Sequence, residues 1–311
     1  MLDSYNHKVI LVGDGAVGST YAFALLQSTH EVDELVIIDR TMAKAAGDAQ
    51  DLLDVTPLTS PVNIHAGTYQ DAHDADIVVI TAGMPRKAGE SRLDLINNNV
   101  AILKSIVDPI VASGFQGIFL ISSNPVDILT TITQRISGFP KERVIGTGTS
   151  LDSMRLRVLL SQKFKIPVSA INALMLGEHG DTSFAAFDEI TVNGQKLVKF
   201  TNLSKADKAS IEKAIHAAGS QIIAQKGATY YGIAKCLAII TRAIIENHNA
   251  VLSISAPLTG QYGINDLYLG APTVINRQGI SQVVEYPLSP QEGAKFKHSA
   301  EMMQNILNKV N

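Results

Sequence analysis

The sequence contains no tryptophan and a single cysteine, Cys236, among its 311 residues. One cysteine cannot build an internal disulfide framework or a cysteine-cluster metal site, and we expect no metal. Cys236 lies in an apolar stretch, residues 232–240, so we expect a buried packing residue. No apolar run approaches about 18 residues, so no transmembrane helix is expected. The N-terminus has no basic region before its first apolar stretch, which argues against a signal peptide.

Runs of like charge are also missing. The 26 basic and 29 acidic residues are scattered and give a net charge of −3, so binding to nucleic acid or to a membrane surface is not expected. The chain is 46% hydrophobic, which is too apolar for a disordered protein. Its length predicts about two domains, and we expect a cytoplasmic protein.

Apolar segments alternate with helix-like segments in the first half. Short β-branched runs occupy residues 8–12, 35–38, 77–80, 118–121 and 144–145, and helix-like stretches occupy 17–27, 41–54 and 97–113. Almost fully apolar strands that alternate with helices predict a parallel sheet covered on both faces. We therefore expect an α/β protein with a Rossmann-type, doubly wound sheet in residues 1–147, which binds ligands at the carboxyl ends of its strands.

The second half, residues 148–311, has a mixed α+β pattern and is predicted to be the substrate domain. We expect a helix after Asp152, a strand at 170–176, and a hairpin at 189–199 with Asn193-Gly194 at its turn. One long helix or two should cover 205–246. Strands should follow in 251–285, and a last helix in 290–310. No long linker separates the halves, so we expect a broad interface with the substrate site near it.

A glycine motif, Gly13-Asp-Gly15-Ala-Val-Gly18, follows the first strand and opens the first helix. In this context the first glycine allows a tight turn, the second admits a pyrophosphate, and the third lets the helix pack on the strand. Asp39 closes the next strand and is expected to accept hydrogen bonds from the ribose hydroxyls. A carboxylate there repels a 2′-phosphate and favours NAD over NADP, although the following Arg40 weakens that inference.

A second group of residues predicts acid–base chemistry. His179 lies between two glycines, after an apolar strand. Asp152 and Arg155 are three residues apart and share one face of a predicted helix. An aspartate beside an imidazole fixes its tautomer and stabilises the imidazolium. Asn124 ends the strand at 118–121, at the sheet edge where this architecture binds ligands.

These motifs together resemble the L-lactate/L-malate dehydrogenase family over nearly the whole chain. The matching segments are GDGAVGS, the strand that ends at Asp39, TAGMPRKAGESRLDL, SNPVDILT, GTSLDSMRLR and GEHGD. Three further segments, DPIVASGFQGIFL, GFPKERVIGTGTSLD and KGATYYGIA, resemble the lactate dehydrogenases of lactic-acid bacteria. The resemblance implies reversible hydride transfer between NADH and a 2-keto acid.

The resemblance also implies a role for each residue of the acid–base group. His179 gives its proton to the keto oxygen in reduction, and Asp152 orients it. Arg155 forms a bidentate pair with the C1 carboxylate. Arg92 polarises the carbonyl, where negative charge develops.

The remaining site residues are implied by the resemblance alone. Asn124 contacts substrate and cofactor, and Thr229 lines the substrate pocket. Cofactor contacts are further implied at Val17, Lys44, Tyr69, Gly83, Met84, Ser105, Ser122, Ser123 and Thr147.

Arg86 is the residue that predicts the substrate. In this family its position meets the distal group of the substrate, and lactate-type enzymes usually have Gln there, whereas malate-type enzymes have Arg. Gly83 and Gly89 bracket this polar segment, which we expect to close as a lid. Arg86 would pair with the second carboxylate of oxaloacetate, while pyruvate would leave a desolvated guanidinium unpaired. We therefore expect a preference for oxaloacetate and L-malate.

Alternatives remain open. If Arg86 is solvated or neutralised by Glu90, the chain is an L-lactate dehydrogenase, which Thr229 and Ile233 favour. A broad or bulkier 2-hydroxy acid is a third possibility. A catalytically silent NAD-binding protein would require damage to the acid–base group, and none is visible.

The resemblance implies a homotetramer or dimer. Some bacterial lactate enzymes bind fructose 1,6-bisphosphate across a subunit interface with an Arg and a His. Arg157 matches the Arg, but Asn172 occupies the His position. Because an imidazolium is missing, we expect weak or absent activation by this ligand.

Overall fold

A computed structural model describes residues 7–85 and 92–310 of the chain. Its centre is a nine-stranded sheet in the order β14-β13-β12-β6-β5-β4-β1-β2-β3. The first six strands in sequence pair in parallel as 3-2-1-4-5-6, the order of a Rossmann fold. Their bounds are β1 Lys8–Val12, β2 Glu34–Ile38, β3 Asn63–Ala66, β4 Ile77–Ile80, β5 Ile118–Ile121 and β6 Val144–Gly146.

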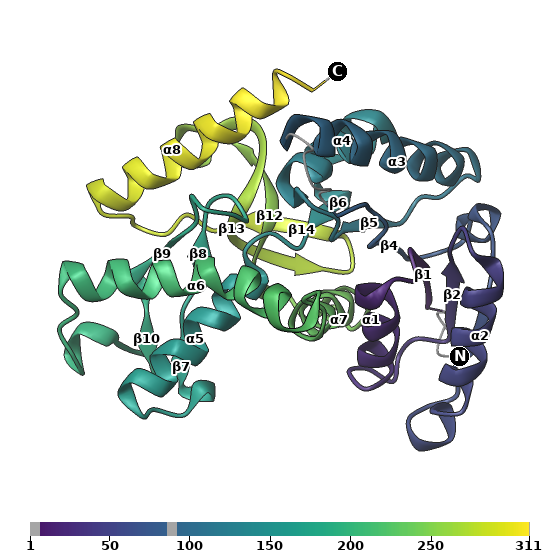
Figure 1. Ribbon diagram of the computed structural model, residues 1–311, viewed down its shortest axis with the longest axis horizontal. Coiled ribbons are helices and arrows are strands. Elements are labelled where there is room, and N and C mark those ends of the chain that lie inside the picture. The colour runs from purple at the N-terminus through teal and green to yellow at the C-terminus, as the bar shows by residue number, and fades with distance from the viewer. Residues whose placement is uncertain (1–6, 86–91, 311) are drawn as a thin grey trace.

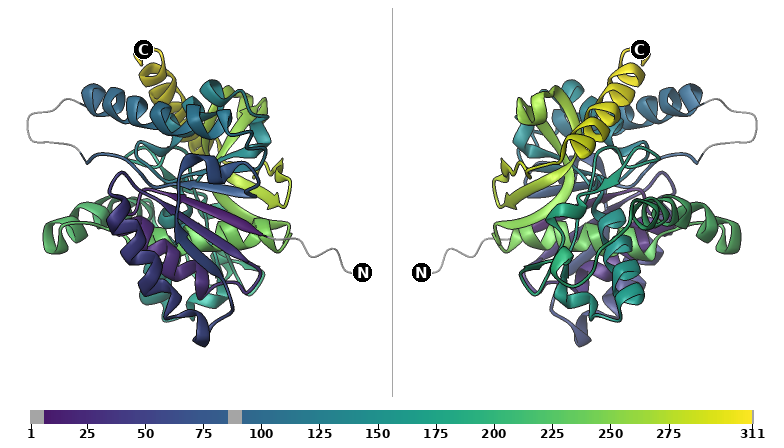
Figure 2. Two further views of the ribbon diagram at one scale, coloured as in Figure 1. Left: turned by 90° about the vertical axis from the view of Figure 1, so that its right-hand side faces the viewer. Right: turned by 90° about the vertical axis from the view of Figure 1, so that its left-hand side faces the viewer.

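Helices cover both faces of this sheet (Figure 1). Side chains of β1 alternate between two apolar cores: Ile10 and Val12 pack with α3, α4 and α8, and Val9 and Leu11 pack with α1, α2 and α7. The turned views show the strands between these two helix layers (Figure 2). The helices are α1 Ala16–Leu26, α2 Met42–Leu53, α3 Arg92–Ala112, α4 Val126–Ser137, α7 Tyr231–Ile245 and α8 Pro290–Leu307. The predicted doubly wound fold is therefore confirmed.

Strands from the second half extend the same sheet, which the sequence did not predict. β12 (Ala250–Thr259) pairs with β6 through Ser255 and Gly146. β13 (Asn265–Asn276) and β14 (Gly279–Val283) continue outward in antiparallel order. The interface between the halves is thus partly a shared sheet.

The rest of the second half forms a smaller lobe with its own core (Figure 1). α5 (Ser150–Phe164) and α6 (Lys205–Lys226) pack there against short strands. The hairpin of β10 (Thr191–Val192) and β11 (Gln195–Lys196) turns at Asn193 and Gly194, which both have positive φ, as predicted. Gly227, at φ +88°, ends α6, so the segment 205–246 contains two helices.

One sequence prediction needs correction, and two elements were not predicted. The segment 170–176 is not one strand, because β7 (Ile171–Asn172) pairs with β10, whereas β8 (Met175–Leu176) pairs with β9 (Phe184–Ala185). The sequence pattern predicted neither α4 nor β3. β3 is an edge strand with only one fully buried side chain, Ile64, and its polar pattern hides it in the sequence.

Candidate active site

The glycine loop between β1 and α1 fits a dinucleotide phosphate. Gly13 has φ +99°, and a Cβ there would lie 2.5 Å from the backbone N of Ala82. A Cβ on Gly18 would collide with the carbonyl oxygen of Gly13. Gly15 differs, because its φ is −81° and a Cβ would meet no protein atom within 4 Å. α1 begins here without a side-chain cap, so its first N–H groups face the open space over Gly15.

Asp39 lies at the end of β2, next to this loop. Its carboxylate accepts hydrogen bonds from the backbone N–H of Asp14 at 2.9 Å and of Thr41 at 2.9 Å. These bonds fix the carboxylate at the carboxyl edge of the sheet, where a ribose would lie beside the phosphate loop. The donor set and the open space over Gly15 therefore fit the adenosine diphosphate part of NAD.

Lys44 forms ion pairs with the carboxylates of Asp14, in the glycine loop, and Asp48, in α2. Its Nζ lies 2.8 Å from Asp14 Oδ2 and 2.6 Å from Asp48 Oδ2. Asp14 is buried, and its Oδ1 has no hydrogen-bond partner among the described residues. Burial raises the pKa of Asp14 to about 6, although the bond from Lys44 opposes this shift. Lys44 is thus linked to the glycine loop through Asp14.

His179 and Asp152 form a close pair. His179 Nδ1 lies 2.6 Å from Asp152 Oδ2, and the Oδ1 atom of the same carboxylate accepts a 3.1 Å bond from Arg155 Nη1. Burial alone would lower the pKa of His179, but Asp152, helped by Asp127, raises it to about 9. Burial would raise the pKa of Asp152, but His179 and Arg155 outweigh it and hold that pKa below its usual range.

The segment that carries His179 is attached to three elements. Gly177 exchanges backbone hydrogen bonds with β13, and the N–H of Glu178 donates to Ser299 Oγ of α8 at 2.6 Å. The N–H of His179 donates to Asp127 Oδ2 of α4 at 2.8 Å. Nδ1 of His179 is engaged by Asp152, so Nε2 is the ring nitrogen left for a ligand.

His179 lines a cavity of about 300 Å³ between the Rossmann sheet and the smaller lobe. Predicted site residues from both halves of the chain line this cavity. Its lining residues are Val17, Ser122, Asn124, Thr147, Leu151, Arg155, His179, Gly219, Ser220, Ile223, Thr229 and Ile233. Apolar Leu151 and Ile223 had no sequence prediction, because nothing in their spacing distinguishes a cavity wall from a core.

Asn99 of α3 links two segments at the edge of this site. Its Oδ1 accepts from Met84 N at 2.8 Å, and its Nδ2 donates to Met84 O at 3.2 Å and Asn124 O at 2.9 Å. Asn99 is only 3% exposed, so these bonds are shielded from water. This role could not be predicted from the sequence, since Asn99 is one of three consecutive asparagines.

Other predicted residues do not line the cavity. Ser123 donates its hydroxyl to Ala82 O at 2.5 Å, and Gly83 follows that segment. Tyr69 is half-buried close enough to Asp39 for this carboxylate to help raise its pKa. Ser105 is exposed on α3, with its hydroxyl on Ile102 O at 2.7 Å.

The structure does not describe the side chains of Arg86 and Arg92, the two arginines predicted to act on the substrate besides Arg155. Arg86 lies outside the described residues, together with 87–91. Arg92 is the first residue of α3, and its side chain is likewise outside what the structure describes.

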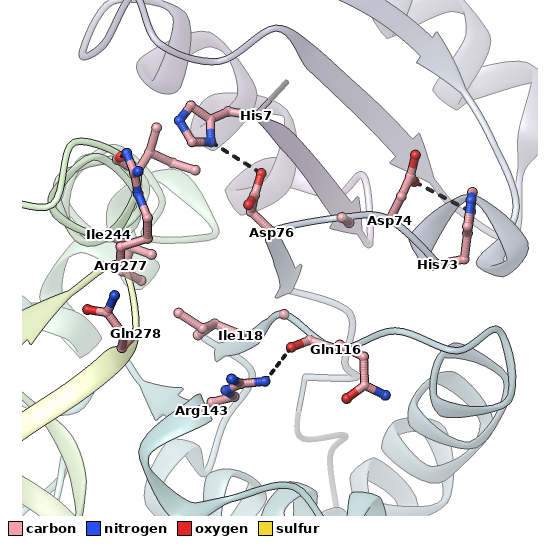
Figure 3. Close-up of a pocket in the computed structure, with 13 residues that line it drawn as sticks. His7, His73, Asp74, Asp76, Gln116, Ile118, Arg143, Ile244, Arg277 and Gln278 are labelled. Carbon is pink, nitrogen blue, oxygen red and sulfur yellow. Dashed lines mark hydrogen bonds and ion pairs between the residues drawn. The ribbon is translucent and has the colours of Figure 1, made fainter. Parts of the chain in front are cut away.

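A further cavity, of about 420 Å³, lies at the opposite edge of the sheet (Figure 3). Its polar groups bind one another: His7 contacts Asp76 at 3.4 Å, and Arg143 donates to the carbonyl of Gln116 at 2.8 Å. None of the predicted site residues lines it. It lies at the amino ends of the strands, where a Rossmann sheet does not bind its cofactor.

Arg157 and Asn172 lie side by side in the folded chain. Arg157 Nη2 donates to Asn172 Oδ1 at 3.2 Å, and Nε donates to Ala173 O at 3.1 Å. Weak or absent activation by fructose 1,6-bisphosphate stays a prediction.

The described residues contain no candidate membrane-spanning helix and no candidate metal-binding group of side chains. Within residues 7–85 and 92–310, no helix is long and apolar enough to cross a membrane. In the same residues no group of three or more His, Cys, Asp or Glu side chains is placed to hold a metal ion. Cys236 is buried.

Comparison with known proteins identifies the family. Residues 7–146 match the lactate/malate dehydrogenase NAD-binding domain, and residues 149–311 match the lactate/malate dehydrogenase alpha/beta C-terminal domain. L-lactate dehydrogenase 2 of Lactiplantibacillus plantarum is 57% identical over 307 residues, 99% of each chain. L-lactate dehydrogenase of Lactobacillus delbrueckii subsp. bulgaricus is 56% identical over 98% of this chain and 99% of its own.

A solved structure has the same fold. The minor L-lactate dehydrogenase of Enterococcus mundtii, in its ligand-bound form, superposes with a TM-score of 0.95 at 38% identity, over 98% of this chain and 99% of its own. The chain uses NAD, because its first half is the NAD-binding domain of this family. With its glycine loop and its His179–Asp152 pair, the chain belongs to the lactate/malate dehydrogenase family of NAD-dependent oxidoreductases, which act on a CH–OH group.

Proposed function

We propose that this protein is an L-lactate dehydrogenase, which interconverts pyruvate and L-lactate with NADH and NAD. The observation that carries the proposal is the His179–Asp152 pair at the wall of a cavity that also contains Arg155 and Thr229. The names of the relatives at 56–57% identity support lactate as the substrate. They favour the alternative over the malate preference expected from Arg86, which finds no support among them.

His179 is the proposed acid and base. Its raised pKa keeps the ring protonated at neutral pH, with one proton held on Nδ1 by Asp152 and the other on Nε2. NADH, when bound, would supply the hydride for C2 of the keto acid. His179 then gives the Nε2 proton to the keto oxygen, and Asp152 stabilises the imidazolium before that transfer.

Two arginines are proposed to bind the 2-keto acid substrate. Arg155 uses one N–H on Asp152 and has further donors for the C1 carboxylate of the substrate. Arg92, at the start of α3, is proposed to polarise the keto group. Asn124 and Thr229 line the cavity and are proposed to contact the substrate.

The cofactor is proposed to extend from the cavity to Asp39. Glycine loop residues would receive the pyrophosphate and Asp39 the ribose. The further residues proposed to contact NAD are Val17, Lys44, Tyr69, Gly83, Met84, Ser105, Ser122, Ser123, Asn124 and Thr147. Asp39 favours NAD over NADP, since its carboxylate repels a 2′-phosphate.

We further propose a division into domains at 147/148, supported by family models that end at residue 146 and begin at residue 149. We also propose a homotetramer or dimer in the cytoplasm. Light scattering on the purified protein tests the assembly.

Malate dehydrogenase is the second candidate, because Arg86 occupies the position that meets the distal group of the substrate. Its guanidinium would pair with the second carboxylate of oxaloacetate. The two candidates therefore differ in whether Arg86 faces the substrate in the closed site.

The deciding experiment compares kcat/KM for pyruvate and oxaloacetate in the parent and in Arg86→Gln. If the proposal is right, pyruvate is preferred in the parent, and the substitution changes the ratio little. A preference of about tenfold or more for oxaloacetate, which Arg86→Gln abolishes, would establish malate dehydrogenase instead.

A further inference from the structure

Asp127 has a buried carboxylate that contacts the segment carrying His179. It lies in the first turn of α4, three residues after Asn124, and it is 2% exposed. Its Oδ2 accepts the backbone N–H of His179 at 2.8 Å, and its Oδ1 accepts the hydroxyl of Ser255 on β12 at 2.5 Å. Both oxygens thus have a hydrogen bond, but neither bond comes from a charged group.

The charges around His179 come from four segments. Asp152 and Arg155 face it from α5, and Asp127 faces it from α4. Glu178 precedes it in the chain, and its carboxylate accepts the hydroxyl of Thr182 at 2.6 Å. Arg92 of α3 is the remaining charged group proposed for the site.

Few groups compensate the charge of Asp127. His179 is the cation that acts on it, whereas Glu178 repels it. A charge that is buried away from water costs free energy unless an opposite charge lies near it. Burial accordingly raises the pKa of Asp127 to about 6, so the carboxylate is still mostly ionised at neutral pH.

We propose that Asp127 is a positioning residue whose buried negative charge acts with Asp152 to keep His179 protonated, while its hydrogen bond holds the peptide of His179 in place. The inference rests on the proposed function, since it adds a second carboxylate to the same acid–base site. Asp152 binds the ring directly, and Asp127 acts through the backbone and through its charge.

The charge and the hydrogen bond can be separated by substitution. Asp127→Asn keeps an oxygen that accepts the N–H of His179, and its amide N–H can donate to Ser255. It removes only the negative charge. The protonated ring then loses stabilisation, so the pKa of His179 falls and keto-acid reduction is lost at a lower pH than in the parent.

The experiment measures kcat/KM for pyruvate reduction against pH in the parent, in Asp127→Asn and in Ser255→Ala. The alkaline limb of Asp127→Asn should move down by about one pH unit. Ser255→Ala is the matched control, because it removes a hydrogen bond to Asp127 but keeps the charge, and its alkaline limb should stay in place. A folded Asp127→Asn whose rate changes equally at every pH has a structural role only, which overturns the proposal.

A titration followed by NMR separates this proposal from the enzymatic one. With ¹³C-labelled histidine, the His179 signal is assigned by its loss in His179→Gln. In the parent this signal should show a small step near pH 6, where Asp127 ionises, besides its own titration near 9. Ser255→Ala should move the small step to higher pH. If Asp127→Asn does not fold, the His179 signal decides. The proposal is overturned if the step near pH 6 is absent in the parent, or if Ser255→Ala does not move it.

Discussion

The Nδ1 atom of His179 lies 2.6 Å from the Oδ2 atom of Asp152, although the two residues are 27 positions apart. α5 presents Asp152 and Arg155 on one face, so a single carboxylate contacts both the imidazole and the guanidinium that would bind the substrate. In the proposed mechanism, proton transfer and substrate binding therefore share Asp152. A substrate that draws Arg155 away from this carboxylate leaves Asp152 more fully available to the imidazolium.

The stability of the protein should depend on pH through His179. Its folded pKa of about 9 lies above the ordinary value of 6.5, so the stabilisation is fully present below pH 6.5 and is lost as the pH rises through 9. We expect the difference in Tm between the parent and His179→Gln to shrink between pH 7 and pH 10. A difference that stays constant over this range would show that no such shift exists.

Gly15 and Gly18 should respond differently to the same substitution. Gly18→Ala places a methyl group against the carbonyl of Gly13, which should destabilise the fold by about 1–3 kcal/mol. Gly15→Ala meets only open space, so its Tm should change little, whereas NADH should bind about tenfold or more weakly, because the methyl occupies the phosphate site. Thermal unfolding and NADH fluorescence titration measure both effects. Unchanged NADH affinity in Gly15→Ala would place the pyrophosphate elsewhere.

Asn99 should affect catalysis without touching the substrate. Asn99→Asp keeps the acceptor for Met84 N but removes the donor to the carbonyls of Met84 and Asn124. The two segments then separate, and kcat/KM should fall by about tenfold or more, because small displacements at a site are costly. Lys104→Ala on the exposed face of the same helix is the control for α3, because the account gives Lys104 no part in binding. Equal kinetics in both variants would exclude a role for Asn99.

The sequence predicted the fold well where local pattern and tertiary context agree. The apolar strands β1, β4 and β5 have fully buried side chains, so their composition alone identified them. β3 has polar residues at the sheet edge, and α4 follows a proline-containing turn, so neither gave a clear local signal. The addition of β12 to the sheet rests on the pairing of Ser255 with Gly146, a contact between residues far apart in the sequence.

The candidate site was predicted in part. His179, Asp152 and Arg155 stand in distinctive motifs, and the structure brings them together. Asp127 and Asn99 went unnoticed, because an aspartate or asparagine on a helix is ordinary until its buried partners are known. Leu151 and Ile223 are further examples, since only the folded chain shows that they line a cavity.

The most direct test of the proposed chemistry is the NADH-dependent reduction of pyruvate by the His179→Gln variant. Glutamine cannot supply a proton, so turnover should fall by about 100-fold or more, while NADH should bind with nearly the parent affinity, because the glycine loop and Asp39 are unchanged. If His179→Gln retained near-parent turnover, His179 would not be the acid and base of this enzyme.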